Sequence, residues 1–196
     1  MKHSRGFSLI ELIFVVTLTG VIAAFAVPAS GNLLATMRLS GDARTLFNTT
    51  SLAKLRAGSN FSQSRVCFDL AQGNYHLETW QKTTNTWTTE SGLVPLSSGV
   101  ALGFQGLGAA PPNTQALINQ SSPCLTTSSP GANPIAGTAC IVFNSRGIPI
   151  DSTATPTNND AFYINDGTTV YAVTVSATGF VQMWRNAVSL NTWVKQ

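Results

Sequence analysis

The feature that most constrains this chain is an apolar run, Phe7 to Val27, with a carboxylate near its start, Glu11. About 20 apolar residues are enough for a helix to cross a bilayer. A carboxylate at membrane depth costs roughly 2.5–3.5 kcal/mol on insertion scales, so its presence there indicates a function. An ordinary secretory signal has an uncharged apolar core followed by a small-residue cleavage site. Here the small residue, Gly6, precedes the run, so cleavage after it would leave the apolar helix on the mature chain.

Cations flank the apolar run unequally. Lys2 and Arg5 precede it, and the first cation after it is Arg38. By the positive-inside rule, this asymmetry places the N-terminus in the cytoplasm and the rest of the chain outside it. No second apolar stretch approaches spanning length, so the sequence predicts a single-pass protein. Removing the two leader cations lowers the formal charge from +3 to +1, which leaves little bulk attraction for nucleic acid.

The start of the chain resembles the class III signal of type IV pilins and type II secretion pseudopilins. The residues that carry the resemblance are Gly6-Phe7-Ser8-Leu9-Ile10-Glu11. The resemblance implies that a prepilin peptidase cleaves after Gly6 and N-methylates Phe7. It also implies that Glu11 pairs with the terminal amine of a neighbouring subunit during filament assembly, and that Gly20 and Pro28 are sites where the helix loosens or kinks. The alternative is an ordinary signal anchor that contains a glutamate by chance.

The hydrophobic period changes along the chain. Helical spacing continues beyond Pro28, which should bend the helix, and predicts an amphipathic stripe of Leu33, Met37, Leu46, Phe47 and Leu55 that packs on a core. From about residue 65 the period becomes two, which predicts β-hairpins, with Asp166-Gly167 as the clearest turn. Residues 105–139 are rich in Gly, Pro, Ser and Asn and are predicted to form a long loop.

Together these patterns predict an α+β protein with the pilin fold, a long N-terminal helix packed on an antiparallel β-rich domain. The predicted parts are a leader at 1–6, a transmembrane assembly helix at 7–28, its amphipathic continuation at 29–58, and a β-rich periplasmic domain at 59–196. Two segments look like the strand-turn elements of GspH/FimT-like minor pilins and pseudopilins. They are Ile141–Gly147, with its F-x-x-x-G pattern, and Val173–Gly179.

Three cysteines, Cys67, Cys124 and Cys140, lie in the part predicted to face an oxidising compartment. We favour a Cys124–Cys140 disulfide, which would close the poorly apolar loop and leave Cys67 free. The competing pair is Cys67–Cys140, if their strands are adjacent. The cysteines lack metal-ligand spacing and the histidines are only His3 and His76, so the sequence predicts no metal site and no cofactor.

The sequence does not favour an enzyme. It has no nucleophile elbow and no glycine-rich phosphate loop after a strand. His76 is expected to be a surface or packed histidine, and Asp69 and Glu78 are expected to be solvated hairpin carboxylates.

The leading hypothesis is a structural subunit in the tip or initiation complex of a type IV pilus or of the type II secretion pseudopilus. Its expected partners are prepilin peptidase, other pilin or pseudopilin subunits and the bacterial inner membrane. The alternative is a DNA-binding minor pilin for natural transformation. Uptake pilins of that kind carry basic residues after the last strand's glycine, whereas Gly179 is followed here by apolar and amide residues. Arg185 and Lys195 are the only candidate substitutes, so nucleic acid binding is not expected.

Overall fold

A computed structural model describes residues 8–196, except for the side chains of residues 25–32. In this part of the chain a helix, α1 (Leu9–Ser59), is followed by strands β1 to β11. The chain divides after Met37 into two compact units, so α1 contributes residues to both. The second unit, which begins at Arg38, is the β-rich domain together with the C-terminal part of α1.

Among the described residues, no helix combines the length and the apolar character needed to cross a membrane.

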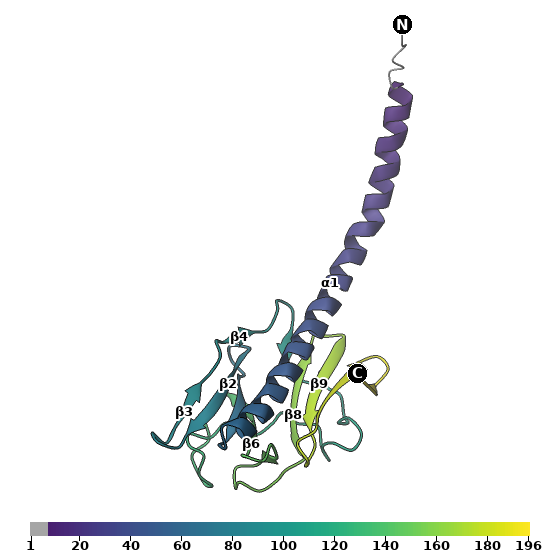
Figure 1. Cartoon of the computed structure of the whole chain (residues 1–196). Coiled ribbons are helices and arrows are strands. Elements are labelled where there is room, and N and C mark those ends of the chain that lie inside the picture. Colours follow the sequence, from purple (N-terminus) through teal and green to yellow (C-terminus); the bar gives the residue numbers. More distant parts are fainter. Residues whose placement is uncertain (1–7) are drawn as a thin grey trace. The chain divides into compact units, whose positions relative to one another are not determined.

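The strands form two antiparallel sheets, and the C-terminal turns of α1 lie against them (Figure 1). The first sheet has the order β3-β2-β1-β6-β7, with β4 paired to β2. Its strands are β1 (Ser64–Asp69), β2 (Asn74–Gln81), β3 (Thr86–Thr89), β4 (Val94–Pro95), β6 (Thr138–Phe143) and β7 (Pro149–Ile150).

The second sheet has the order β11-β10-β9-β8-β5. Its strands are β5 (Ala101–Leu102), β8 (Asp160–Asn165), β9 (Thr169–Val175), β10 (Val181–Ala187) and β11 (Thr192–Lys195). The predicted Asp-Gly turn joins β8 to β9. There the carboxylate of Asp166 accepts hydrogen bonds from the backbone N–H groups of Thr168 and Thr169, at 2.9 and 2.8 Å. The predicted α+β fold, with an N-terminal helix on antiparallel sheets, is confirmed.

One hydrophobic core lies between α1 and the inner faces of both sheets. The period of two on β1 sends Val66 and Phe68 into this core, where Phe68 meets Phe162 of the second sheet at 5.5 Å between ring centroids. Arg65 and Cys67 consequently lie on the outer face of the first sheet. The core therefore joins three elements that are distant in sequence, and it orients the turns between their strands.

The predicted amphipathic stripe of α1 was wrong in most of its members. Leu33, Met37 and Leu55 are 58%, 57% and 67% exposed, whereas Leu46 is buried and Phe47 is partly buried. The buried positions recur every three or four residues and are mostly small. They are Leu39, Ala43, Leu46, Thr50, Ala53 and Ala57. Small side chains let the helix axis approach the sheets closely. A prediction based on large apolar residues therefore missed the buried face of α1.

The segment between β5 and β6 covers the outer faces of both sheets. Phe104, Leu107 and Ile118 pack on Tyr163 and its neighbours behind the second sheet, and form a smaller second core. Further along, Cys124 and its surroundings pack behind the first sheet. The predicted loop at 105–139 is therefore a structural cover for both sheets, which its polar composition conceals.

Candidate functional site

The N-terminal part of α1 presents large apolar side chains to its surroundings in every direction. Their exposed fractions run from 48% to 76%. They are Leu9, Ile10, Leu12, Ile13, Phe14, Val15, Val16, Leu18, Val21 and Ile22. A helix that is apolar on all sides is one that is buried in an apolar environment. This segment thus needs a cover of lipid or of other protein chains.

The polar groups on this segment are few. Glu11 is exposed in the first turns of α1, and it is the only Asp, Glu, Lys or Arg between Phe7 and Met37. The hydroxyl groups of Thr17 and Thr19 donate to backbone carbonyls one turn earlier, for example Thr19 to Val15 at 2.9 Å. Threonines bonded in this way carry no unsatisfied donor into an apolar environment. In an apolar environment, Glu11 would therefore be the polar side chain of this segment that still needs a charged or hydrogen-bonding partner.

Two glycine turns of the domain meet each other beside α1. In the first, the N–H of Gly147 donates to the carbonyl of Asn144 at 2.8 Å, and in the second the N–H of Gly179 donates to the carbonyl of Ser176 at 2.7 Å. Both glycines have positive φ, +70° and +77°. A methyl group on Gly179 would overlap the carbonyl oxygen of Gly147, and one on Gly147 would meet the side chain of Lys54. The two strand-turn segments seen in the sequence are therefore one contact that ties the two sheets together.

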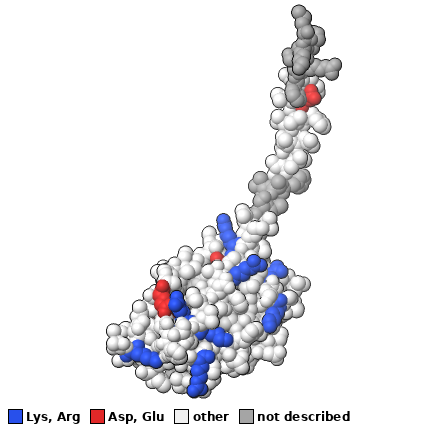
Figure 2. Space-filling model, viewed as in Figure 1, with Lys and Arg blue, Asp and Glu red and all other residues white. Residues whose placement is uncertain are grey.

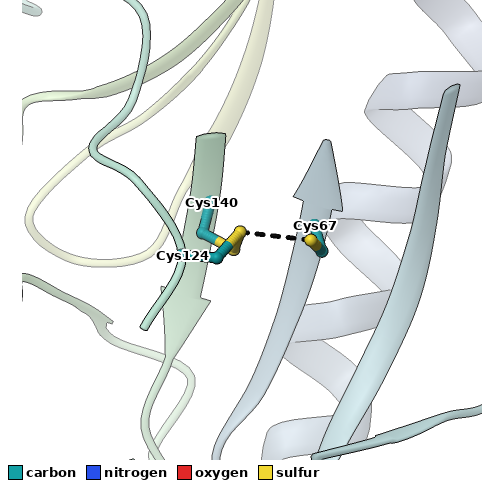
Figure 3. A group of neighbouring side chains, drawn as sticks. All are labelled: Cys67, Cys124 and Cys140. Atoms are coloured by element: carbon teal, nitrogen blue, oxygen red, sulfur yellow. Dashed lines mark hydrogen bonds between the residues drawn. A yellow bond between two sulfur atoms is a disulfide. The ribbon is translucent and has the colours of Figure 1, made fainter. Parts of the chain in front are cut away.

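The three cysteines form one buried cluster behind the first sheet (Figure 3). A disulfide joins Cys124 to Cys140, with 4.9 Å between their Cα atoms, and Cys67 is free. Cys67 on β1 and Cys140 on β6 are directly paired neighbours, so the strands of the competing pair are adjacent as well. Burial raises the pKa of the Cys67 thiol to about 11, because a thiolate would lose its hydration there; the Glu78 carboxylate raises it further.

Beside this cluster lies an ion pair that the sequence did not reveal. Arg65 is 3% exposed, and its Nε donates a hydrogen bond to Glu78 Oε2 at 2.5 Å. Its guanidinium carbon lies 3.9 Å from the ring centroid of Trp87. The same Glu78 lies 3.2 Å from His76 Nε2 through its second oxygen. The expectation that Glu78 is a solvated hairpin carboxylate was therefore wrong, because its side chain is only 13% exposed and it is the common partner of Arg65 and His76. The signal for this ion pair in the sequence was Arg65, a basic residue that pairing of β1 with β2 places opposite Glu78.

Possible metal ligands also meet at this place. Cys67, His76 and Glu78 offer ligand atoms within 4.8 Å of one another, although no metal-binding spacing links them in the sequence. Cross-strand pairing brings them together, since Cys67 and His76 are directly opposed on β1 and β2. Glu78 is already engaged by the Arg65 guanidinium, whose charge opposes a cation. The thiol is 7% exposed, which does not favour it as a nucleophile for an external substrate.

Comparison with known protein families finds a match at the N-terminus of the chain. Residues 1–27 match the family model described as the prokaryotic N-terminal methylation motif. The predicted resemblance to type IV pilins and type II secretion pseudopilins is confirmed. This motif contains Gly6, Phe7 and Glu11, which the pilin resemblance names as the cleavage, methylation and assembly positions. Gly6 and Phe7 lie outside the described residues, and Glu11 lies in the first turns of the exposed apolar part of α1.

Two solved structures are similar to this pilin-like chain, and both are of the minor pseudopilin EpsH from the type II secretion system of Vibrio cholerae. One is 13% identical over 74% of this chain and 92% of that chain, with a TM-score of 0.45. The other is 12% identical over 81% of this chain and 96% of that chain, with a TM-score of 0.38. No curated protein matches the sequence.

Helix α1 is continuous through both predicted kink positions, Gly20 and Pro28. Gly20 has open space around it within α1, and the side chain of Pro28 lies outside the described residues. The helix kink stays a prediction.

The two candidate DNA contacts do not converge. Arg185 pairs with Val194 and Trp184 pairs with Lys195, so Arg185 and Lys195 lie on opposite faces of the β10–β11 hairpin. The Lys195 ammonium lies 5.6 Å from the ring centroid of Phe180 and 5.9 Å from that of Trp184. Figure 2 shows the Lys and Arg side chains of the domain scattered over the visible face. This geometry gives the DNA-uptake alternative no support.

Proposed function

We propose that the protein is a minor pilin or pseudopilin, a structural subunit that enters the tip or initiation complex of a type IV pilus or a type II secretion pseudopilus. Prepilin peptidase processes it, the helix after the cleavage site anchors it in the inner membrane, and its β-rich domain lies in the periplasm. The observation that carries the proposal is Glu11, a lone carboxylate on an exposed apolar helix within the matched methylation motif.

The partition of the chain suits such a subunit. The exposed apolar residues from Leu9 to Ile22 require lipid or neighbouring helices, whereas the domain from Arg38 onward has its own core. A filament subunit needs both parts, because the helix is inserted among other subunits while the domain stays folded. An ion pair between Glu11 and a neighbour's terminal amine would satisfy two charges that are each costly alone in an apolar environment.

The first prediction concerns processing. The mature chain should begin at Phe7, with one N-methyl group on its amine. Intact-mass and N-terminal peptide analysis of protein isolated from the native membrane measures both features. A mature terminus beyond Val27 would remove the apolar helix and contradict the proposed function.

The second prediction concerns assembly. Glu11→Ala should reduce incorporation into filaments or tip complexes by at least about tenfold, since leaving one member of a desolvated ion pair unpaired costs roughly 3–5 kcal/mol. Membrane insertion and the fold of the domain should be unchanged. The measurement compares the amount of variant in sheared filaments, or in crosslinked tip complexes, with the amount in the membrane.

Two further variants test whether assembly requires the charge of Glu11 or only the shape of its side chain. Glu11→Gln keeps the size of the side chain but removes the charge, so it should fail in the same way as Glu11→Ala. Thr19→Ala lies on the same exposed segment and removes only a hydroxyl that is bonded within the helix, so it should assemble normally. Normal incorporation of Glu11→Gln would show that charge pairing is not the role of Glu11.

A further inference from the structure

Three sulfur atoms from three separate segments share one buried site. Cys67 lies on β1, Cys140 lies opposite it on β6, and Cys124 belongs to the segment that covers the sheet. Their exposed fractions are 7%, 5% and 0%. The disulfide uses two of these sulfur atoms and leaves the third, that of Cys67, as a thiol.

The free thiol touches the disulfide. Cys67 Sγ lies 3.1 Å from Cys124 Sγ, the contact drawn as a dashed line in Figure 3. Because Cys67 is the only one of the three that carries a thiol hydrogen, it is the donor in this contact. A thiol held against a disulfide sulfur is the arrangement from which thiol–disulfide exchange begins.

We propose that Cys67, Cys124 and Cys140 form an intramolecular thiol–disulfide exchange site, in which the disulfide moves from Cys124–Cys140 to Cys67–Cys124. The Cys67 thiol first loses its proton to become a thiolate. The thiolate then attacks Cys124 Sγ, the bond between Cys67 and Cys124 forms, and the bond between Cys124 and Cys140 breaks. Cys140 leaves as a thiolate and takes up a proton, so the exchange needs no oxidant or reductant.

The surroundings of Cys67 set how the exchange depends on pH. Burial and the carboxylates of Glu78 and Asp69 oppose the thiolate, and the guanidinium of Arg65 favours it. His76 is directly opposite on β2, and one of its ring nitrogens lies within 4.8 Å of the thiol. Because only the thiolate attacks, the exchange should be slow at neutral pH and should accelerate by about tenfold per pH unit below the pKa of Cys67, about 11.

The exchange would move a crosslink within the fold. In the starting state the covering segment is tied through Cys124 to β6. In the product it is tied to β1 instead, and Cys140 becomes the free thiol. The disulfide of this protein is thus shared between two strands of the same sheet and is not fixed to one of them.

The test uses the full-length protein in detergent, incubated in its folded state without added thiol at about pH 7 and at about pH 10. At intervals the exchange is stopped with acid, the chain is unfolded, and the free thiol is labelled with N-ethylmaleimide. Peptide mapping without reduction then locates both the label and the disulfide. We expect the label to appear on Cys140 together with a Cys67–Cys124 crosslink, and to appear faster at the higher pH.

Two variants and two labelling outcomes decide the result. Cys67→Ala should keep the Cys124–Cys140 disulfide and take up no label, which controls for breakage of the disulfide by anything other than the Cys67 thiol. Cys140→Ala, oxidised gently with glutathione disulfide, should form Cys67–Cys124. A label that remains on Cys67 alone at high pH overturns the proposal, and so does a label on Cys124, which would mean that Cys140 is the sulfur attacked. The wild-type labelling is decisive even if Cys140→Ala fails to fold.

Discussion

Gly179→Ala is expected to lower the free energy of unfolding of the domain by about 2–5 kcal/mol, combining left-handed backbone strain of roughly 1–2 kcal/mol with overpacking of roughly 1–3 kcal/mol. The strain arises because Gly179 has a φ of +77°. The overpacking arises because the added methyl group would overlap the carbonyl oxygen of Gly147, which is backbone and cannot rotate away. Relief would require the two turns, and with them the two sheets, to move apart.

The matched control is Gly167→Ala. Gly167 also has a positive φ, +89°, but a methyl group there meets no atom within 4 Å. It should therefore cost only the strain, roughly 1–2 kcal/mol. Urea or guanidinium unfolding of the two variants in detergent, followed by tryptophan fluorescence, compares them. Equal destabilisation by both substitutions would mean that the contact between Gly147 and Gly179 does not hold the sheets together.

The sequence predicted the parts of this fold that depend on local pattern. A few consecutive residues are enough to predict each of three such features: the Asp-Gly hairpin, the alternation around Val66 and Phe68, and the glycine turn at Gly147. The sequence also marked Glu11, since a carboxylate in a long apolar run is conspicuous without any structure. These are features whose physical cause lies within one element or one turn.

The sequence did not predict features that need contacts between distant segments. The buried face of α1 is made largely of alanines such as Ala43 and Ala53, which become core residues only because two sheets approach them. Strands β4 and β11 are short edge strands whose pairing, not their composition, defines them. The pairing of Arg65 with Glu78 and the cluster around Cys67 both follow from the register between strands, which the alternation within a single strand does not set.

The second large effect is expected at Asp160, the first residue of β8. This carboxyl is 7% exposed, and its Oδ2 has no hydrogen-bond partner. Burial raises its pKa from 3.8 to about 7; the charge of Asp151 raises it further, and a hydrogen bond from Ser121 lowers it. The folded chain therefore holds a proton on Asp160 at pH values where the unfolded chain has released it.

The direction of the pH dependence follows from this difference. Between about pH 4 and pH 7 the unfolded state binds fewer protons at Asp160 than the folded state, so the free energy of unfolding falls as the pH rises. The loss is complete above the folded pKa and amounts to roughly 4 kcal/mol, since each pKa unit corresponds to about 1.4 kcal/mol. Asp160→Asn cannot ionise, so its contribution should not change with pH. The variant should gain stability relative to wild type as the pH rises from 4 to 8.

Asp166→Asn is the matched control for this pH dependence. Burial opposes ionisation of Asp166 too, but hydrogen bonds from Thr168 and Thr169 outweigh it and lower its pKa. Its carboxylate should therefore stabilise the fold fully above the unfolded pKa of 3.8 and lose this contribution as the pH falls below it. Relative to wild type, Asp166→Asn should lose stability as the pH rises to about 4 and should then run parallel to wild type up to pH 8. Denaturant unfolding of wild type and both variants from about pH 2 to about pH 8 measures the three curves. If Asp160→Asn runs parallel to wild type, Asp160 is ionised in the folded protein at neutral pH, with a partner such as water or a cation at its free oxygen.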